Sequence, residues 1–330
     1  MPPKYDVAGL GNAIMDVIAA VDDQFLLDHG IAKGGMTLID EFRAEELHRA
    51  LKDSVQTAGG SAANTMAGIA SLGGSAVFLG KVRDDVLGAR FRESLKSLGV
   101  DYTTAPAANG SSTASSMIAV TPDGQRSMNT YLGACREMTP ADIDVREVAA
   151  AKILYIEGYL WDTDDSKDAS RKAIRAAKEA GARVALTLSD SFCVGRFRDE
   201  FLGLMQHDLD IIFANEAEAH SLFETEDFAI VTERMQAWGG LAALTRSAKG
   251  CVVVKGPDVH AVPAAPVAKV VDTAGAGDLF AAGFLFGLAQ GKGLADCGKL
   301  GALAAAEIIS HYGARPEVSL KDLAAKAKLI

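Results

Sequence analysis

Short apolar segments rich in β-branched residues alternate with longer amphipathic segments over most of this 330-residue chain. The short segments have the length and composition of buried strands, and the longer ones have the 3.6-residue apolar spacing of helices. The expected strands are residues 5–10, 76–80, 153–156, 184–188, 211–214 and 251–255, and the expected helices are residues 45–54, 62–72, 86–97, 168–180, 235–239, 278–290 and 294–311. This alternation predicts an α/β fold with a mostly parallel sheet flanked by helices on both faces. In such a fold, ligands bind beyond the carboxyl ends of the strands.

Two segments interrupt the alternation. Residues 16–39 contain short β-like pieces, and residues 112–131 have the pattern of a hairpin around the turn at residues 121–124. We expect these two segments to build a small separate β-sheet. The remaining residues, 1–15, 40–111 and 132–330, are expected to form the large α/β domain.

Composition and charge exclude several classes of partner. The formal net charge of −10 argues against a general nucleic-acid or anionic-membrane surface. The N-terminus lacks the apolar core of a signal peptide, and the most apolar run, residues 280–289, is too short to span a bilayer. The four cysteines show no paired spacing, which fits a reducing cytoplasm better than a disulfide framework or a zinc site. Whether the chain is a monomer or a dimer stays open.

The stretch from Val271 to Phe284 carries the clearest chemical signal. A β-branched run at residues 267–271 predicts a strand, small residues predict a tight turn, and an apolar helix is expected from Asp278. Glycine lets the backbone approach a ligand, and a helix start supplies unpaired N–H groups, so this turn can hold a phosphate. A lone Asp278 is explained as an N-cap. A cap needs only one acidic residue, however, and this turn contains both Asp272 and Asp278.

The string from Asp272 through Gly283 and Phe284 resembles the signature of the ribokinase family of sugar and nucleoside kinases, the phosphofructokinase-B family. The resemblance implies a ribokinase-like fold in which the small β-sheet is a lid over the substrate, and ATP with Mg²⁺ as the phosphoryl donor. It implies that Asp278 accepts the proton of the acceptor hydroxyl. The resemblance also implies two other roles for this turn. Backbone N–H groups stabilise the transferring phosphoryl group, and they belong to Ala274, Gly275, Ala276 and Gly277. Asp272 and Thr273 bind a monovalent cation, usually K⁺.

Substrate-binding residues are expected in several places. The first expected strand is followed by a glycine-rich segment that lacks the third glycine of a dinucleotide fingerprint, because Ile14 stands there. Residues 59–64 match the family's Gly-Gly-x-x-x-Asn motif, although alone they would be only a helix capped by Ser61. The resemblance implies substrate contacts from Asn12, Asp16, Gly59, Gly60 and Asn64, with Arg126 and Glu157 as further candidates. For Asp16, the alternative is a residue that only orders its loop.

The nucleotide site is expected after two later strands. Residues 215–218 match the family's Asn-x-x-Glu motif, which implies that Asn215 and Glu218 organise Mg²⁺, usually through water. The alternative is an acidic helix start favoured by the helix dipole. Residues 245–250 resemble the nucleotide loop. The expected ATP contacts are Asn215, Thr245, Arg246, Gly250, Gly275 and Gly277. Arg83 and Ser247 stand where the family usually has glycine, and their roles stay open.

Several of these motifs together resemble the adenosine kinase branch of the family. The expected function is therefore ATP-dependent phosphorylation of the 5′-hydroxyl of a purine nucleoside such as adenosine. Two alternatives stay open. One is a carbohydrate kinase acting on ribose, fructose or a related sugar, which is favoured by Glu157 as a possible sugar-binding carboxylate. The other is a catalytically idle sensor of nucleosides or sugars. Candidates for contact with a base, each equally explained as lid or core packing, are Ile14, Met36, Met128, Tyr159, Leu160 and Trp161.

Overall fold

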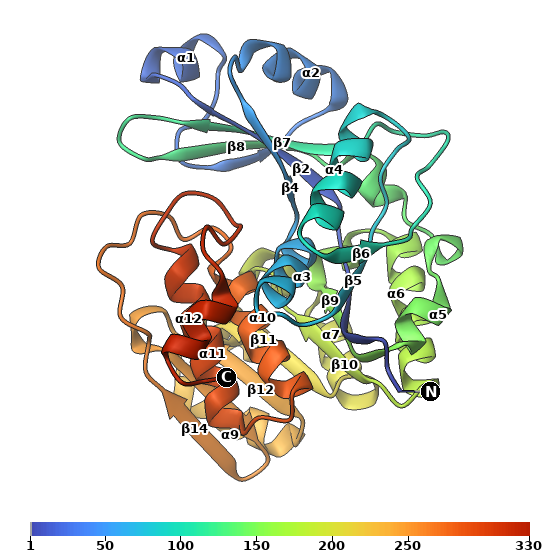
Figure 1. The fold of residues 1–330 in the computed structure, drawn as a ribbon, viewed down its shortest axis with the longest axis vertical. Coiled ribbons are helices and arrows are strands. Elements are labelled where there is room, and N and C mark those ends of the chain that lie inside the picture. Colours follow the sequence, from blue (N-terminus) through green and yellow to red (C-terminus); the bar gives the residue numbers. More distant parts are fainter. Residues whose placement is uncertain (1) are drawn as a thin grey trace.

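The computed structural model describes residues 2–330 and contains two β-sheets of unequal size (Figure 1). The larger sheet has nine strands in the order β14-β13-β12-β11-β10-β9-β1-β5-β6. Neighbouring strands from β12 to β6 are parallel, whereas β13 and β14 form an antiparallel edge. The strands are β1 (Tyr5–Leu10), β5 (Ala76–Leu79), β6 (Val100–Tyr102), β9 (Ala151–Glu157), β10 (Arg183–Thr187), β11 (Ile211–Asn215), β12 (Leu241–Thr245), β13 (Cys251–Lys255) and β14 (Asp258–Val262).

Helices cover both faces of this sheet, and each face has its own apolar core. One core includes α3 (Ser61–Ser71), α4 (Val86–Ser97), α10 (Ala276–Ala289), α11 (Leu294–Ile308) and α12 (Leu320–Lys326). The other includes α5 (Val145–Ala149), α6 (Asp164–Glu179), α7 (Ser191–His207), α8 (Glu216–Phe223) and α9 (Phe228–Trp238). The predicted α/β architecture is therefore confirmed.

Small residues let α10 lie very close to its neighbours. A Cβ atom at Gly68 of α3 would lie 2.6 Å from the Cβ of Ala282, and one at Gly283 would overlap the carbonyl oxygen of Leu300 in α11. Any larger side chain at either glycine would push the helices apart. These close crossings hold the first turn of α10 beside the first turn of α3.

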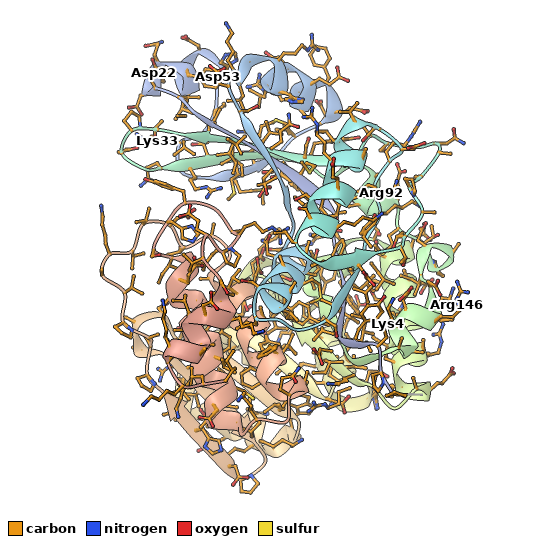
Figure 2. All side chains as sticks on the ribbon, viewed as in Figure 1. Lys4, Asp22, Lys33, Asp53, Arg92 and Arg146 are labelled. Carbon is orange, nitrogen blue, oxygen red and sulfur yellow. The ribbon has the colours of Figure 1, made fainter. Side chains whose placement is uncertain are left out.

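The smaller sheet has five strands in the order β3-β8-β7-β2-β4. They are β2 (Ile14–Ala20), β3 (Met36–Leu38), β4 (Val55–Gly59), β7 (Ala114–Val120) and β8 (Arg126–Tyr131). Helices α1 (Asp23–Asp28) and α2 (Glu41–Ala50) cover the face turned away from the larger sheet, as Figure 1 shows. The core between that face and the helices is apolar, with Val17, Ala19 and Met117 from the sheet and Leu26 and Leu47 from α1 and α2. An exposed lysine, Lys33, pairs with Asp23 and Asp123 at 2.6 Å and links α1 to the β7–β8 turn (Figure 2).

The opposite surface of the smaller sheet, here called the open face, follows from strand register. Asp16 pairs with Ser116, Ile118 pairs with Met128, and Met128 pairs with Met36. Since paired residues on neighbouring strands point to the same side, these side chains share one surface. The open face comprises Ile14 and Asp16 of β2, Ser116 and Ile118 of β7, Arg126, Met128 and Thr130 of β8, and Met36 and Leu38 of β3.

The smaller sheet is larger than the sequence predicts. Strand β4 pairs antiparallel with β2, and α2 packs on the same sheet, although both lie within residues 40–111 that were expected in the large domain. The residues of β4 are Val-Gln-Thr-Ala-Gly, which lack apolar alternation. Their strand conformation comes from pairing with β2 and not from local preference.

The predicted strand at residues 267–271 is wrong. This segment is irregular, and Val270 is 56% exposed. The N–H of Val271 bonds to the carbonyl of Ile309 at 2.8 Å, in the turn after α11. A β-branched run forms a strand only where a neighbouring strand supplies hydrogen bonds. Within residues 2–330, no helix combines the length and hydropathy needed to cross a membrane.

Candidate active site

Asp278 lies inside α10 and does not cap it. The N-cap is Gly275, whose φ of 76° is left-handed. The Asp278 carboxylate accepts hydrogen bonds from the Ser61 hydroxyl at 2.6 Å and from the Asn64 side-chain amide at 2.9 Å, both in the first turn of α3. Burial raises the pKa of Asp278, whereas these two bonds and the charge of Arg315 hold it down. The Asn64 Oδ1 is buried without a protein partner, so it stays available to a substrate hydroxyl.

The turn before α10 presents backbone N–H groups beside this carboxylate. The N–H of Ala274 donates to Asp272 at 3.0 Å, and that of Ala276 donates to a backbone carbonyl in the same turn at 3.2 Å. Throughout residues 2–330, the N–H groups of Gly275 and Gly277 have no hydrogen-bond partner. No neighbouring atom lies within 4 Å of the Cβ position at Gly277. Two of the four expected anion-binding donors are therefore available, and they lie at the positive end of a helix.

A second carboxylate, Asp16, approaches the site from the open face of the smaller sheet. A Cβ atom at Gly59 would lie 2.5–2.6 Å from all three carboxyl atoms of Asp16, so glycine is needed there. The next residue, Gly60, has a φ of 92° and caps α3. Burial raises the pKa of Asp16 to about 6, against the positive charges of Arg126 and Arg315, and the charge of Asp278 raises it further. Gly59 lies against Asp16, and Ser61, two residues later, bonds to Asp278, so the two carboxylates belong to one site.

Glu157, expected as a sugar ligand, is only 1% exposed at the end of β9. Its two oxygens accept backbone N–H bonds, from Asn12 at 2.8 Å and from Ala62 at 2.9 Å. A side chain at Gly11 would overlap the Glu157 carboxylate. Burial raises the pKa of Glu157 to about 7. In this arrangement Glu157 ties the β1–β2 joint to the start of α3.

Arg126, on the open face, forms an ion pair with Asp272 in the turn before α10. The N–H groups of Ala274 and Gly313 also donate to this carboxylate, at 3.0 and 3.1 Å. Burial alone would raise the pKa of Asp272, but these contacts hold that pKa below its usual range. A guanidinium and two N–H groups thus occupy the carboxylate expected to bind K⁺, while Thr273 is exposed. This arrangement does not fit a monovalent cation at Asp272.

Asn215 and Glu218 form a reciprocal capping box at the start of α8. The N–H of Glu218 donates to the Asn215 side chain at 2.8 Å, and the N–H of Asn215 donates back to Glu218 at 3.0 Å. The helix-start alternative is therefore correct in geometry, yet it does not exclude a metal role. Burial raises the pKa of Glu218 to about 7, and the charges of Asp190 and Asp278 add to the shift. Mg²⁺ bound through water needs few protein ligands, so the capping box leaves a metal role for Glu218 open.

The expected nucleotide loop follows β12 beside this capping box, because Thr245 pairs with Asn215 across β11 and β12. Arg246 bonds to Glu216 at 2.6 Å and lies 3.7 Å over the Phe228 ring, so its charge is partly used within the protein. Ser247 has a φ of 51°, the left-handed conformation in which the family uses glycine. A side chain at Gly250 would overlap the carbonyl of Val262. Arg83, the other departure, bonds to the Gly110 carbonyl in a distant loop and not to the site.

The apolar candidates for base contact divide into two groups. Ile14, Met36 and Met128 lie on the open face. Leu160 and Trp161 are each 1% exposed in the core, where Trp161 packs 5.8 Å from Phe201. Tyr159 is 38% exposed, which is more than Ile14 or Met128, both half-buried. The residues of the first group share a sheet surface with Asp16.

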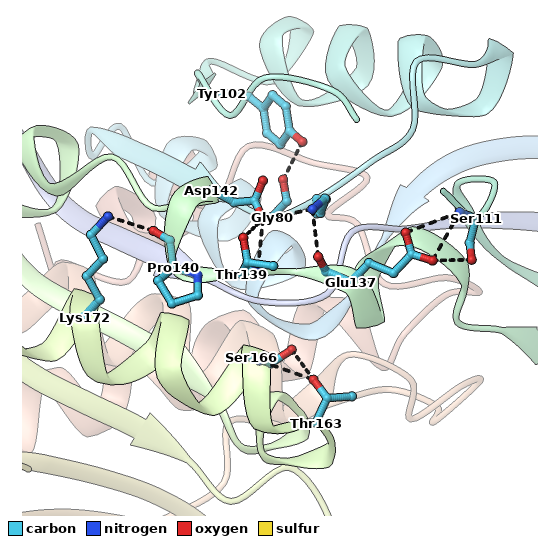
Figure 3. A network of polar contacts seen from close by, with 11 residues as sticks. Gly80, Tyr102, Ser111, Glu137, Thr139, Pro140, Asp142, Thr163, Ser166 and Lys172 are labelled. Atoms are coloured by element: carbon cyan, nitrogen blue, oxygen red, sulfur yellow. Dashed lines mark hydrogen bonds and ion pairs between the residues drawn. The ribbon is translucent and has the colours of Figure 1, made fainter. Parts of the chain in front are cut away.

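A polar network fixes the segments that carry the β7–β8 hairpin (Figure 3). Lys81 donates to the Glu137 carbonyl at 2.7 Å and lies 3.0 Å from the Asp142 carboxylate. The Glu137 carboxylate in turn accepts the Ser111 N–H at 3.2 Å. Ser111 precedes β7 and Glu137 follows β8, so the two ends of the hairpin are tied to each other by the Glu137 carboxylate, and the half-buried Lys81 holds the Glu137 backbone. The hairpin therefore rests on a fixed base.

Known proteins match this chain over nearly its whole length. Residues 10–320 match the model of the pfkB family carbohydrate kinases. Adenosine kinase from Saccharomyces cerevisiae is 28% identical, over 92% of this chain and 94% of that protein. The structure of adenosine kinase from Sinorhizobium meliloti is 52% identical with a TM-score of 0.90, over 98% of this chain and 99% of that one. A probable sugar kinase from Rhizobium etli CFN 42 is 49% identical with a TM-score of 0.91, over 99% and 100%.

Proposed function

This chain belongs to the pfkB family of carbohydrate kinases, and we propose that it transfers the γ-phosphoryl group of ATP to the 5′-hydroxyl of adenosine or a close purine nucleoside. As a member of this family it is a phosphotransferase with an alcohol group as acceptor. One observation carries the proposal. The Asp278 carboxylate, oriented by Ser61 and Asn64, lies in the same helix turn as the free N–H groups of Gly275 and Gly277.

In the proposed reaction, Asp278 accepts the proton of the substrate's primary hydroxyl. The hydroxyl oxygen then bonds to the γ-phosphorus as the bond to ADP breaks. A well-placed general base is worth about 10²–10⁴ in rate. The N–H groups of Gly275 and Gly277 bind the oxygens of the transferring group, where charge is concentrated.

Substrate recognition is assigned to the residues around the Gly59–Gly60 joint. Asp16 and Asn64 offer a carboxylate and a free amide oxygen to the ribose hydroxyls. Further along the open face, on strands β3 and β8, the apolar side chains of Met36 and Met128 are offered to a flat base, and stacking of this kind is worth roughly 1–3 kcal/mol. At the end of this face, a cavity of about 400 Å³ is lined by Leu38 and Thr130, among others. Ribose or fructose would leave this apolar surface uncovered.

Nucleotide binding is assigned to the ends of β11 and β12. Kinases of this family use ATP with Mg²⁺. Thr245 and Gly250 would contact the nucleotide, and Glu218, held by Asn215, would hold the ion through water. When bound, the ion neutralises phosphate charge. Asp278 remains free of it, since its carboxylate already faces Ser61 and Asn64.

The test is ADP release measured by a coupled assay with adenosine, ribose and fructose in turn, and with no acceptor. We expect a kcat/KM for adenosine at least about tenfold above those for either sugar, since one stacked base contributes more than 1 kcal/mol. A preference for ribose or fructose would make the chain a sugar kinase, in line with the name given to its Rhizobium etli relative. No acceptor-dependent release with any of the three would favour a binding protein.

A further inference from the structure

Arg315 lies in the segment between α11 and α12, outside every motif that the sequence singles out. Its guanidinium makes three hydrogen bonds, all to backbone carbonyls. Nε and Nη2 donate to Ala58 at 3.0 and 2.6 Å, and Nη1 donates to Ala63 at 2.7 Å. A guanidinium removed from water usually pairs with a carboxylate. Here it binds two carbonyls that are close in sequence but belong to different elements.

The two carbonyls flank the joint between the smaller sheet and the larger domain. Ala58 lies in β4 immediately before Gly59, and Ala63 lies in α3 immediately before Asn64. Between them, Gly60 has a left-handed φ of 92°. The fork geometry of arginine lets one side chain fix both sides of this joint. Arg315 therefore fixes the distance between the strand beside Asp16 and the helix that carries Asn64.

The charge of Arg315 acts on both carboxylates of the site. It favours the ionised forms of Asp16 and Asp278, which disfavour each other. Burial lowers the pKa of Arg315 to about 10, so the side chain stays cationic at neutral pH. Other charged groups that act on these carboxylates are Arg126 of β8, which favours ionised Asp16, and Glu157 of β9 and Glu218 of α8, which repel the charge of Asp278.

The same segment also contacts the anion-binding turn. The N–H of Gly313 donates to Asp272 at 3.1 Å, and a Cβ atom at Gly275 would lie 2.8 Å from that of Ala314. Three consecutive residues, 313–315, thus touch the start of the turn, its helix cap and the joint of the smaller sheet.

We propose that Arg315 is a positioning residue for phosphoryl transfer, which fixes the joint between β4 and α3 and supplies the positive charge that lets Asp16 and Asp278 be anionic together. One anion then binds the substrate while the other accepts its proton. The inference rests on the proposed role of Asp278 as the base. It adds a role for a residue that touches neither reacting group in the structure.

The experiment compares three variants across pH, with kcat and KM for adenosine and thermal unfolding measured for each. Arg315→Gln keeps a donor for the carbonyls and removes the charge, Arg315→Lys keeps the charge and removes the fork, and Arg198→Met is the control. Arg198 also bonds a backbone carbonyl, that of Leu222 at 2.8 Å, but on α7 away from the site. Losing a nearby opposite charge raises a carboxylate pKa by about 1 unit or more. We therefore expect the acid limb of kcat/KM to move to higher pH by about 1 unit in Arg315→Gln.

The other variants separate charge from structure. Arg315→Lys should keep the acid limb of the wild-type enzyme while its kcat falls, because the joint is held less firmly. Arg198→Met should change thermal stability at most. An acid limb at the wild-type pH in folded Arg315→Gln would overturn the proposal, and so would a shift of that limb in Arg315→Lys equal to the shift in Arg315→Gln. If Arg315→Gln does not fold, guanidinium ion is added to Arg315→Ala instead. The added ion should return the acid limb of kcat/KM to the pH of the wild-type enzyme. An acid limb that does not move would contradict the charge role.

Failure of this inference is distinguishable from failure of the proposed function. If Asp278→Asn is inactive and the Arg315 variants keep the wild-type acid limb, only the role of Arg315 is wrong. If Asp278→Asn turns over normally, the assignment of the base is wrong, whatever the Arg315 variants show.

Discussion

Replacing Gly59 with alanine tests the arrangement of the site with a single methyl group. The backbone of Gly59 is not left-handed, so alanine meets no conformational barrier there. Its Cβ atom, however, would lie 2.5–2.6 Å from the three carboxyl atoms of Asp16. Carbon and oxygen atoms in ordinary contact are about 3.5 Å apart. The Asp16 carboxylate must therefore move by nearly 1 Å, or β4 must move away from β2.

A displacement of this size at a substrate-binding group can cost about 10² in rate. The overpacked site should also lose about 1–3 kcal/mol of folding free energy. We expect kcat/KM for adenosine to fall by about 10–100-fold in Gly59→Ala. The measurements are steady-state kinetics with adenosine and thermal unfolding with and without it.

The matched control is Gly203→Ala in α7, where no atom lies within 4 Å of the Cβ position. Alanine inside a helix should raise stability by about 0.5–1 kcal/mol and leave the kinetics unchanged. Wild-type kinetics in Gly59→Ala would refute the claim that Asp16 needs this space to bind substrate. A fall in the control equal to that in Gly59→Ala would point to a general loss of folding instead.

Three further predictions follow from the site. Asp278→Asn should lower kcat at least about a hundredfold with KM changed only a few-fold, measured by ADP release, and near-normal turnover would exclude the base role. Replacing K⁺ with choline should leave the rate unchanged, because Arg126 already occupies Asp272, and strong activation by K⁺ would contradict that ion pair. Met128→Ala should raise KM for adenosine more than it lowers kcat, since a base contact is equal in ground and transition states. Leu160→Ala should instead lose about 2–5 kcal/mol of stability, seen in thermal unfolding, and equal effects of both variants on KM would contradict the open face as the base site.

The larger sheet was predictable because its strands are buried on both faces. Continuous apolar runs such as residues 251–255 identify such strands directly, and the helix at residues 86–97 has clear apolar spacing and ends before Gly99. The helix α7 was missed, although it is 17 residues long. It contains Gly195 and Gly203 and a non-helical residue at Phe197, which obscure its period.

The smaller sheet was predicted only in part, because its edge strand depends on tertiary pairing. Residues 55–59 carry no local strand signal, and β2 supplies their hydrogen bonds. The opposite error occurred at residues 267–271, where β-branched composition is strong but no strand pairs with it in the described chain. In both segments, pairing with a distant strand decides whether a strand forms. The local sequence carries no information about that pairing.

A site residue was predictable where one sequence motif contains both that residue and the groups beside it. Asp278 and the glycines before it are an example. The sequence did not predict the partners of these groups. Ser61, for which a cap of α3 was only the alternative interpretation, donates to Asp278. Arg315, in a segment without secondary structure, had no signal at all, because its acceptors are backbone carbonyls and any residue supplies those.

The most direct test of the central claim is the identity of the phosphorylated product. The enzyme is incubated with ATP, Mg²⁺ and an equimolar mixture of adenosine and ribose, and the new phosphate ester is identified by ³¹P NMR. We predict one main product, a phosphomonoester on the 5′-carbon of adenosine, whose signal is split by the two 5′ protons and whose formation is abolished in Asp278→Asn. Phosphorylated ribose as the main product, or a nucleoside phosphate formed equally well by Asp278→Asn, would contradict it.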